Sequence, residues 1–258
     1  MTWNPDVYHR HRTARDAPAH DLMALLPPHP YRSVVDLGCG TGQHTLTLSR
    51  QFPEAQVLGL DSSAEMLARA SEHHAPNLTF QQADLQDLHG TFDLMFSNAA
   101  LQWLPDHPAL LERLWPHLNL GGMLAVQVPS NHDHPSHRLL SETADEFREE
   151  LAGFTRFGPV AGHSPVLTPV QYAEVLHHLG ATDIVAMSRV YPVVLPGAEG
   201  VLDWVRGTAL VPYLGRLTPE DGARFEAAYL ARLKAEWPDP EVYYPFLRTL
   251  FVAQKPQG

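Results

Sequence analysis

The chain has a single cysteine, Cys39, among its 258 residues, so an intramolecular disulfide framework is excluded. It has no apolar run approaching the roughly 18 residues of a membrane span, and no charged and then apolar leader opens it. Its 18 basic residues stand against 29 acidic ones, a formal net charge of −11 that disfavours nonspecific binding to nucleic acid. We therefore expect a cytoplasmic monomer or weak homodimer with neither a membrane nor a nucleic-acid partner.

A glycine-rich motif, VVDLGCGTGQHT, occupies residues 34–45. The apolar residues of 34–37 suit a short buried strand, and residues 41–52 resume as a helix. Between them, three glycines let the backbone turn sharply and pass close to a ligand: Gly38, Gly40 and Gly42. A strand, a glycine loop and a helix in this order predict a nucleotide site at the carboxyl end of the strand.

Two acids indicate which kind of nucleotide the loop receives. A second strand, 56–60, ends in Asp61, whose carboxylate can accept hydrogen bonds from both hydroxyls of a ribose. The dinucleotide fingerprint is G-x-G-x-x-G, whereas here Asp36 precedes the glycines as D-x-G-x-G-x-G. Asp36 would repel a pyrophosphate but suits a ligand with an ammonium or sulfonium group. The pattern resembles the first motif of the class I S-adenosylmethionine-dependent methyltransferases; the alternative is a glycine-rich turn without a ligand.

Further strand ends extend the predicted cofactor site. Asp84 follows a strand over 78–82, where the adenine amino group needs an acceptor, and Leu85 can offer its backbone N–H and pack on the ring. Helix capping is the alternative role for Asp84. Asn98 follows a strand over 92–97 beside the glycine loop, which places it near the methionine end of the ligand.

Strands and helices alternate along most of the chain, which predicts an α/β fold with a doubly wound, mainly parallel sheet. Two helices within 197–240 depart from this alternation, and the second carries an aromatic-rich face with Phe225, Tyr229, Leu233 and Trp237. We expect a single domain, 1–258, in which 197–240 is a helical cap inserted over the substrate site. A place in the core is the alternative for most of these aromatic residues.

The whole chain resembles the trans-aconitate 2-methyltransferase family in three stretches: WNPDVY at 3–8, SNAALQWLPDH at 97–107 and YPFLRTLFVA at 244–253. The resemblance runs from Trp3 to Ala253, so it includes the cap. It implies a Rossmann-like class I methyltransferase fold, with a seven-stranded, mostly parallel sheet and helices on both faces. It also implies methyl transfer from S-adenosylmethionine to one carboxylate of a small tricarboxylate such as trans-aconitate.

The resemblance further implies which residues hold the cofactor. The matching positions are Asp36, Gly38, Asp61, Asp84 and Asn98, with Arg15 near the carboxylate of the ligand. The predicted cofactor-binding set also includes their neighbours in sequence: Gly40, Gly42, Ser62, Met66 and Leu85.

The chemistry of a carboxylate methyl acceptor determines which catalytic groups the protein needs. Such a group has a pKa near 4 and is ionised at neutral pH, so no general base and no catalytic residue are required. Alignment and exclusion of water then do the catalysis. Arg206 and Arg248 are the predicted receptors, because a guanidinium donates two parallel hydrogen bonds to a carboxylate; a structural salt bridge is the alternative for each. Four other side chains are predicted to position the acceptor, or else belong to core or rim: Tyr8, Trp103, His132 and Tyr213.

Two features of the sequence leave alternatives open. His132, His134 and His137 cluster after the fifth strand, but no cysteine or compact carboxylate accompanies them, so we predict a solvated or substrate-facing cluster and no metal. Residues 150–166 depart from the family pattern, which leaves the acceptor open. The alternative functions are methylation of malonyl-acyl carrier protein, which would need a basic docking patch, and a cofactor-binding regulatory protein without turnover.

Overall fold

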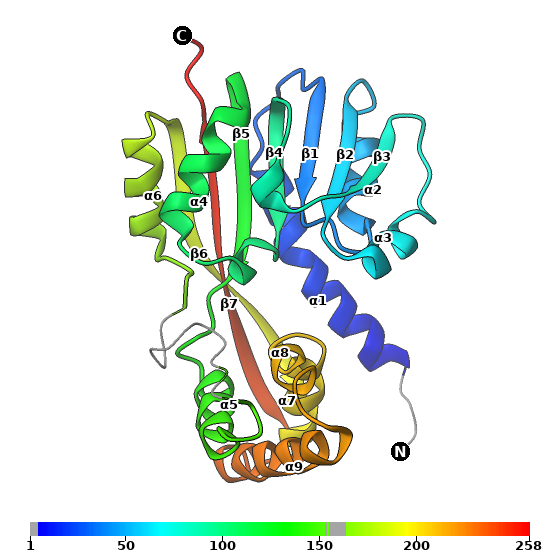
Figure 1. Ribbon diagram of the computed structural model, residues 1–258, viewed down its shortest axis with the longest axis vertical. Coiled ribbons are helices and arrows are strands. Elements are labelled where there is room, and N and C mark those ends of the chain that lie inside the picture. Colours follow the sequence, from blue (N-terminus) through cyan, green and yellow to red (C-terminus); the bar gives the residue numbers. More distant parts are fainter. Residues whose placement is uncertain (1–4, 153, 155–163) are drawn as a thin grey trace. The chain divides into compact units, whose positions relative to one another are not determined.

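Figure 1 shows the computed structural model, which describes residues 5–152, 154 and 164–258. Within these residues, a seven-stranded sheet has the order β3-β2-β1-β4-β5-β7-β6. The strands are β1 (Ser33–Leu37), β2 (Gln56–Asp61), β3 (Leu78–Gln82), β4 (Phe92–Asn98), β5 (Leu118–Pro129), β6 (Thr182–Leu195) and β7 (Val242–Gln254). The predicted Rossmann-like α/β fold is confirmed.

The strand order creates a crevice at the centre of the sheet. β1 pairs in parallel with β2 on one side and β4 on the other, so Asp36 is in register with both Gly59 and Phe96. The chain runs outward from β1 through β2 to β3, then crosses to the other side of β1 for β4 and β5. Such a reversal opens a ligand-binding crevice at the carboxyl ends of the two central strands. β7 pairs with β5 in the antiparallel direction, so the sheet is mostly parallel.

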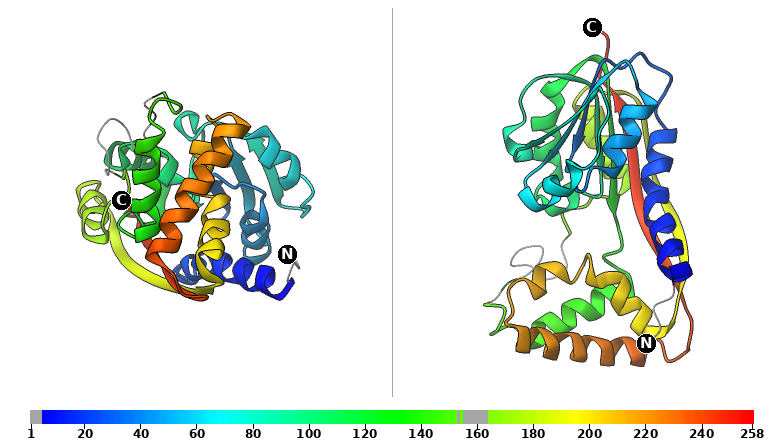
Figure 2. Two further views of the ribbon diagram at one scale, coloured as in Figure 1. Left: turned by 90° about the horizontal axis from the view of Figure 1, so that it is seen from below. Right: turned by 90° about the vertical axis from the view of Figure 1, so that its right-hand side faces the viewer.

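Helices cover both faces of this sheet. α1 (Pro5–Ala24) packs against β5, and α2 (Gln43–Gln51), which begins after the glycine loop, packs against β2. α4 (His107–Leu114) and α6 (Pro169–His178) lie on the opposite face of the sheet (Figure 2, right). Their apolar residues are buried in one cluster with alternate residues of the central strands. A short helix, α3 (Ala64–Ala70), follows β2. Both faces of the sheet are thus covered by helices, as a doubly wound parallel sheet requires.

A second compact unit, residues 130–164 and 190–247, is considered by itself; where it is described it is mainly helical and also contains strand residues 190–195 of β6 and 242–247 of β7. It contains α5 (Pro135–Glu146), α7 (Gly197–Arg206), α8 (Val211–Leu214) and α9 (Pro219–Glu236). The helical unit therefore includes α5 in addition to the 197–240 segment.

The aromatic face of α9 forms the core of this helical unit. Phe225, Tyr229 and Leu233 are fully buried, and α9 packs against both α5 and α7. The Tyr229 hydroxyl donates to the backbone oxygen of Ser136 at 2.8 Å, which ties α9 to α5. A place in the core, the alternative raised from the sequence, describes these residues. None of the helices in the described ranges has both the length and the apolar character needed to cross a bilayer.

Gly59 in β2 offers a test of the packing behind the glycine loop. A Cβ at this position would lie 2.6 Å from the Phe80 ring and 3.0 Å from Cys39 Sγ. Gly59→Ala should therefore lower the free energy of unfolding by about 1–3 kcal/mol in urea denaturation. Gly207→Ala is the matched control, because no atom lies within 4 Å of an added Cβ there. Equal losses in the two variants would contradict this account of the packing.

Candidate functional site

A pocket of about 450 Å³ lies at the carboxyl ends of β1, β2 and β4. It belongs entirely to the sheet unit. Its lining is Gly38, Gly40, Asp61, Ser62, Ser63, Met66, Ala83, Asp84, Leu85, Ala99, Ala100, Trp103 and Leu104. The crevice expected from the strand order is therefore present, and most of the predicted cofactor-binding residues line it.

The glycine loop approaches the segment after β4 too closely for a side chain. Gly38 has φ +75°, and a Cβ there would lie 2.3 Å from the Cβ of Ala100. Gly40 has φ +54° and open space around it, so its backbone faces the pocket without obstruction. Gly42, at φ +76°, lies outside the lining and begins α2 against the Phe80 ring. The first two glycines thus shape the pocket, whereas the third shapes the packing behind it.

Asp61 fastens the two walls of the pocket to each other. Its Oδ2 accepts from the backbone N–H of Gly40 at 2.8 Å, and its Oδ1 accepts from the backbone N–H of Ser63 at 2.8 Å. A carboxylate offers about four lone-pair sites, so two remain for ligand hydroxyls. Sequence reasoning predicted the ribose role of Asp61 and missed this bracing of the glycine loop against the start of α3.

Asp36 lies beneath the glycine loop and is only 2% exposed. Burial raises the pKa of its carboxyl group to about 7; the hydrogen bond from Thr45 Oγ1, at 2.7 Å, opposes that rise, and the charge of Asp61 adds to it. Asp36 does not line the pocket, so any influence on a ligand there would come from its charge and not from direct contact. A cation bound in the pocket would favour the ionised form.

The remaining predicted cofactor residues divide into two groups. Asp84 and Leu85 line the pocket where β3 ends, and Ser62 and Met66 line it at the start of α3. Asn98 is outside the lining, although its neighbours Ala99 and Ala100 are part of it. Asn98 Oδ1 is buried and accepts no hydrogen bond within the described part of the chain. Arg15 lies exposed on α1 and is not part of the pocket lining.

Among the predicted acceptor-positioning residues whose side chains the structure describes, Trp103 alone lines this pocket, and its side chain is half exposed. It belongs to the short 3-10 turn Leu101–Trp103, and the buried side chain of His107 holds this turn in place. The His107 ring contacts the backbone oxygen of Leu101 through Nε2, at 3.0 Å, and the hydroxyl of Tyr172 on α6 through Nδ1. The wall that carries Trp103 is therefore fixed to the buried core.

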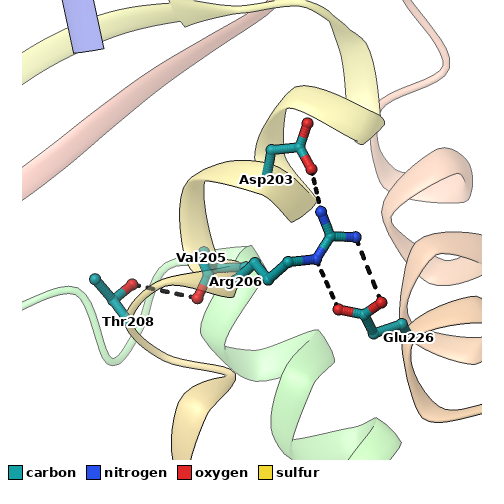
Figure 3. Close-up of polar contacts among 5 residues, drawn as sticks. All are labelled: Asp203, Val205, Arg206, Thr208 and Glu226. Carbon is teal, nitrogen blue, oxygen red and sulfur yellow. Dashed lines mark hydrogen bonds and ion pairs between the residues drawn. The ribbon is translucent and has the colours of Figure 1, made fainter. Parts of the chain in front are cut away.

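Arg206 requires a correction, because it does not lie in the apolar surroundings expected of a carboxylate receptor. Its Nε donates to Glu226 Oε1 at 2.8 Å, and its Nη1 donates to Asp203, as Figure 3 shows. Nη2 reaches the second oxygen of Glu226 at 3.4 Å, and 46% of the side chain is exposed. The structural salt bridge, the alternative raised from the sequence, describes this arginine.

The other predicted acceptor residues lie at varied places. Tyr213 is buried in the helical unit and stacks on Phe225 with ring centroids 5.7 Å apart, so it is a core residue in this structure. His132 is half-buried at the start of the helical unit. Arg248, half-buried on β7, is in register with Pro129. Tyr8 falls within α1, but its side chain lies outside the described part of the structure, as do Trp3 and most of 150–166.

The histidine cluster is built into the helical unit. His134 caps α5 by accepting from the backbone N–H of Ser136, and its ring packs on Tyr244 and Trp237. Burial lowers the pKa of His134 to about 4, so its imidazole is neutral at physiological pH. His137 Nδ1 lies 3.1 Å from the Ser136 hydroxyl. His134 is therefore a partly buried cap of α5, and a substrate-facing role for the cluster stays a prediction. No group of three potential metal ligands occurs in the described residues.

Sequence reasoning missed five lining residues: Ser63, Ala83, Ala99, Ala100 and Leu104. Small residues carry no chemical signal of their own. Their positions do carry one, because Ala83 precedes Asp84 and Ala99 follows Asn98. Ala99 also has φ +53°, a left-handed conformation that is costly for a residue with a Cβ. The turn leads from Ala99 into Ala100, and both residues line the pocket.

The fold and the pocket define a class I S-adenosylmethionine-dependent methyltransferase. A methyltransferase-domain family matches residues 34–122. A trans-aconitate 2-methyltransferase of Deinococcus radiodurans is 64% identical, with 100% of both chains covered, and one of an Azoarcus species is 38% identical, with 98% of each covered. The chain belongs to the trans-aconitate 2-methyltransferase family.

Solved structures resemble the chain in fold. The YcgJ protein of Bacillus subtilis superposes with TM-score 0.61 at 15% identity, covering 94% of this chain and 99% of its own. Phosphoethanolamine N-methyltransferase 2 of Haemonchus contortus, in complex with S-adenosyl-L-methionine, superposes with TM-score 0.54 at 19% identity. That match covers 92% of this chain, which spans only 53% of the worm enzyme. These identities support the fold alone.

The predicted family, the methyltransferase class and S-adenosylmethionine as cofactor are thereby confirmed, with a small molecule as the substrate class. The malonyl-acyl carrier protein and regulatory alternatives are not favoured by these relatives.

Replacing Asp61 should weaken cofactor binding sharply. Asp61→Ala removes the acceptor proposed for the ribose and releases the Gly40 and Ser63 amides that it holds. We expect the Kd for S-adenosylhomocysteine to rise roughly ten- to a hundredfold in calorimetry, as for hydrogen bonds to a charged group. Glu65→Ala, which removes the same charge from an exposed position on α3, should leave the Kd within about twofold. An unchanged affinity in Asp61→Ala would remove this residue from the site.

Asp36 should make the stability of the ligand-free protein depend on pH. Its pKa is raised from 3.8 to about 7 on folding, so the folded state binds more protons than the unfolded state between these values. The contribution of Asp36 to the free energy of unfolding is therefore complete below pH 4 and is lost as pH rises through 7. Asp36→Asn should gain stability relative to wild type across that window, by a few kcal/mol at most at about 1.4 kcal/mol per pKa unit. Parallel urea-denaturation profiles from pH 4 to 8 would contradict the assignment.

Proposed function

We propose that this protein transfers a methyl group from S-adenosylmethionine to one carboxylate of trans-aconitate or a closely related small tricarboxylate. The observation that carries the proposal is the 64% identity, along the full length of both chains, to a protein named for this reaction. The pocket at the switch point of the sheet supports it, because it offers acids and open backbone where a cationic nucleoside would bind.

The residues of the pocket fit the methyl donor. When bound, S-adenosylmethionine supplies a methyl group activated by a sulfonium charge. Asp61 has lone pairs left for the ribose hydroxyls, and Asp84 lies exposed in the lining at the end of β3 for the adenine amino group. Asn98 Oδ1 has no hydrogen-bond donor in the described chain, and an ammonium group would provide one. The ionised form of Asp36 favours the positive charge of the ligand.

The acceptor requires positioning and desolvation more than proton transfer. Its carboxylate is already ionised at neutral pH, so the protein need not remove a proton. Trp103 and Leu104 present apolar surface on the lining beside Ala99 and Ala100, which suits exclusion of water from the reacting groups. Orientation of two bound partners can account for several kcal/mol of the barrier.

Four further assignments are part of this proposal. Residues 197–240, which supply α7, α8 and α9, cover the acceptor in the proposed arrangement, and Arg248 binds one of its carboxylates. The enzyme works in the cytoplasm as a monomer or weak homodimer. Sedimentation equilibrium at micromolar concentration tests the last point directly, since a stable dimer would double the apparent mass of 28.7 kDa.

A methyl-transfer screen tests the proposed activity. The wild-type enzyme and radiolabelled S-adenosylmethionine are incubated with trans-aconitate, cis-aconitate, citrate, isocitrate and malonyl-acyl carrier protein. We expect the highest kcat/KM with trans-aconitate, and an extractable product whose label alkaline hydrolysis releases as methanol. Label on malonyl-acyl carrier protein alone, or on none of the acids, would overturn the proposed function.

Arg248→Ala should impair the acceptor step selectively. Loss of a charged hydrogen-bond donor should raise the KM for trans-aconitate roughly ten- to a hundredfold, with the Kd for S-adenosylhomocysteine within about threefold of wild type. Arg206→Ala is the matched control, because the guanidinium of Arg206 is held by Glu226 and Asp203. If both variants keep the wild-type KM, Arg248 is structural; if only Arg206→Ala raises it, the two roles are reversed.

A further inference from the structure

Gln127, near the end of β5, is a buried amide that none of the roles above accounts for. Its side chain is 1% exposed, and its Nε2 makes no hydrogen bond within the described ranges. An unpaired buried amide is costly, by an amount comparable to a lost hydrogen bond, and most such groups in folded proteins are paired. A donor left in this state at the carboxyl edge of the sheet therefore needs an acceptor from outside the described chain.

The register of the sheet places Gln127 beside the cofactor site. Gln127 on β5 is paired with Asn98 on β4, so the two side chains lie next to each other on the same face. The backbone N–H of Ala99, which lines the pocket, donates to the backbone oxygen of Gln127 at 2.9 Å. Gln127 is thus one strand away from the pocket wall and fixed to it by the main chain.

The same face carries two other groups relevant to an ionic ligand. Asp36 is in register with Phe96, two residues before Asn98, so its carboxylate points to this face. Arg248 is in register with Pro129, two residues beyond Gln127, so it belongs to this face as well. The face therefore presents an acid at β1, an amide acceptor and an amide donor at β4 and β5, and a cation at β7.

We propose that Gln127 binds a carboxylate, that of the donor's amino-acid end or that of the acceptor, through its side-chain Nε2. The proposal deepens the function proposed above and rests on it. The donor's amino-acid end fits the pair of orphan atoms, because its ammonium can donate to Asn98 Oδ1 while its carboxylate accepts from Gln127 Nε2. A tricarboxylate acceptor has no ammonium and would satisfy Gln127 alone.

Gln127→Leu is the informative variant. It keeps much of the side-chain volume and removes the amide, so the free energy of unfolding should stay the same or rise. The Kd for S-adenosylhomocysteine should increase roughly ten- to a hundredfold in calorimetry. Gln127→Glu, nearly isosteric but negatively charged, should weaken binding further because it faces a carboxylate with a carboxylate.

Thr249→Val provides the matched control. Thr249 is also 1% exposed, and its Oγ1 likewise has no partner in the part of the chain that the structure describes. It is in register with Val128, so it faces the other side of the sheet from Gln127. This variant should leave the Kd for S-adenosylhomocysteine and the KM for trans-aconitate within about twofold of wild type. The comparison then distinguishes a specific effect of the face that carries Gln127 from a general effect of removing a buried polar group without a hydrogen-bond partner.

Decarboxylated S-adenosylmethionine separates the two sources of carboxylate. It retains the ammonium and sulfonium groups, so Gln127→Leu should change its Kd by less than about twofold if the donor's carboxylate is the partner. An unchanged Kd for S-adenosylhomocysteine with a tenfold higher KM for trans-aconitate would assign the acceptor's carboxylate instead.

The proposal is overturned if Gln127→Leu leaves both the Kd and the KM within twofold of wild type. It is also overturned if the variant weakens decarboxylated S-adenosylmethionine as much as S-adenosylhomocysteine, since the effect would then not depend on a carboxylate. The binding measurements need no turnover. A wild-type enzyme that fails to methylate trans-aconitate would therefore sink the proposed function without deciding the role of Gln127.

Discussion

The site depends on one carboxylate that holds two backbone amides. Asp61 spans from Gly40 to Ser63, so the glycine loop after β1 and the first turn of α3 keep one fixed separation. Neither amide has a partner within a regular helix or strand at that point, so Asp61 provides the hydrogen-bond acceptor for both. A ligand that binds Asp61 therefore meets a group already oriented by the protein. Such preorganisation lowers the entropic cost of binding.

The charge beneath this loop explains why the fold suits a cation. Asp36 is buried beside Thr45, and desolvation raises its pKa to about 7 even with a hydrogen bond in place. Its ionised form is thus unfavourable in the free protein and becomes more favourable when positive charge arrives nearby. A phosphate at the same loop would have the opposite effect. Dinucleotide-binding proteins place a pyrophosphate at a glycine-rich loop after the first strand, whereas here an acid precedes the glycines and, in the function proposed above, favours a sulfonium nucleoside.

The parts of the structure that sequence reasoning predicted are those determined by local pattern. The run from 34 to 45 specifies a strand, a turn with three positive φ values and a helix, and each step depends on residues next to one another. The partners of Arg206 and Asp61 were not predictable in this way. Glu226 lies 20 residues from Arg206 on a different helix, and Gly40 lies 21 residues from Asp61. Only the packed fold brings these groups together, which is also why α5 joins a helical unit expected to contain 197–240 alone.

In an acidic protein, the carboxylates of the protein compete with an anionic acceptor for the available cationic side chains. In the described part of the helical unit, six cations each lie within 4.0 Å of a carboxylate: Arg138, Arg148, Arg206, Arg224, Arg232 and Lys234. Using any of them for a ligand would require exchange of one carboxylate for another, with little net electrostatic gain. A neutral amide such as Gln127 is less subject to capture by the 29 acids and loses less on burial than a cation does. A carboxylate at the end of the sheet can therefore be bound by such a neutral donor together with few charged groups. For this reason a buried, uncharged polar side chain there is a better candidate for binding a carboxylate than another surface arginine.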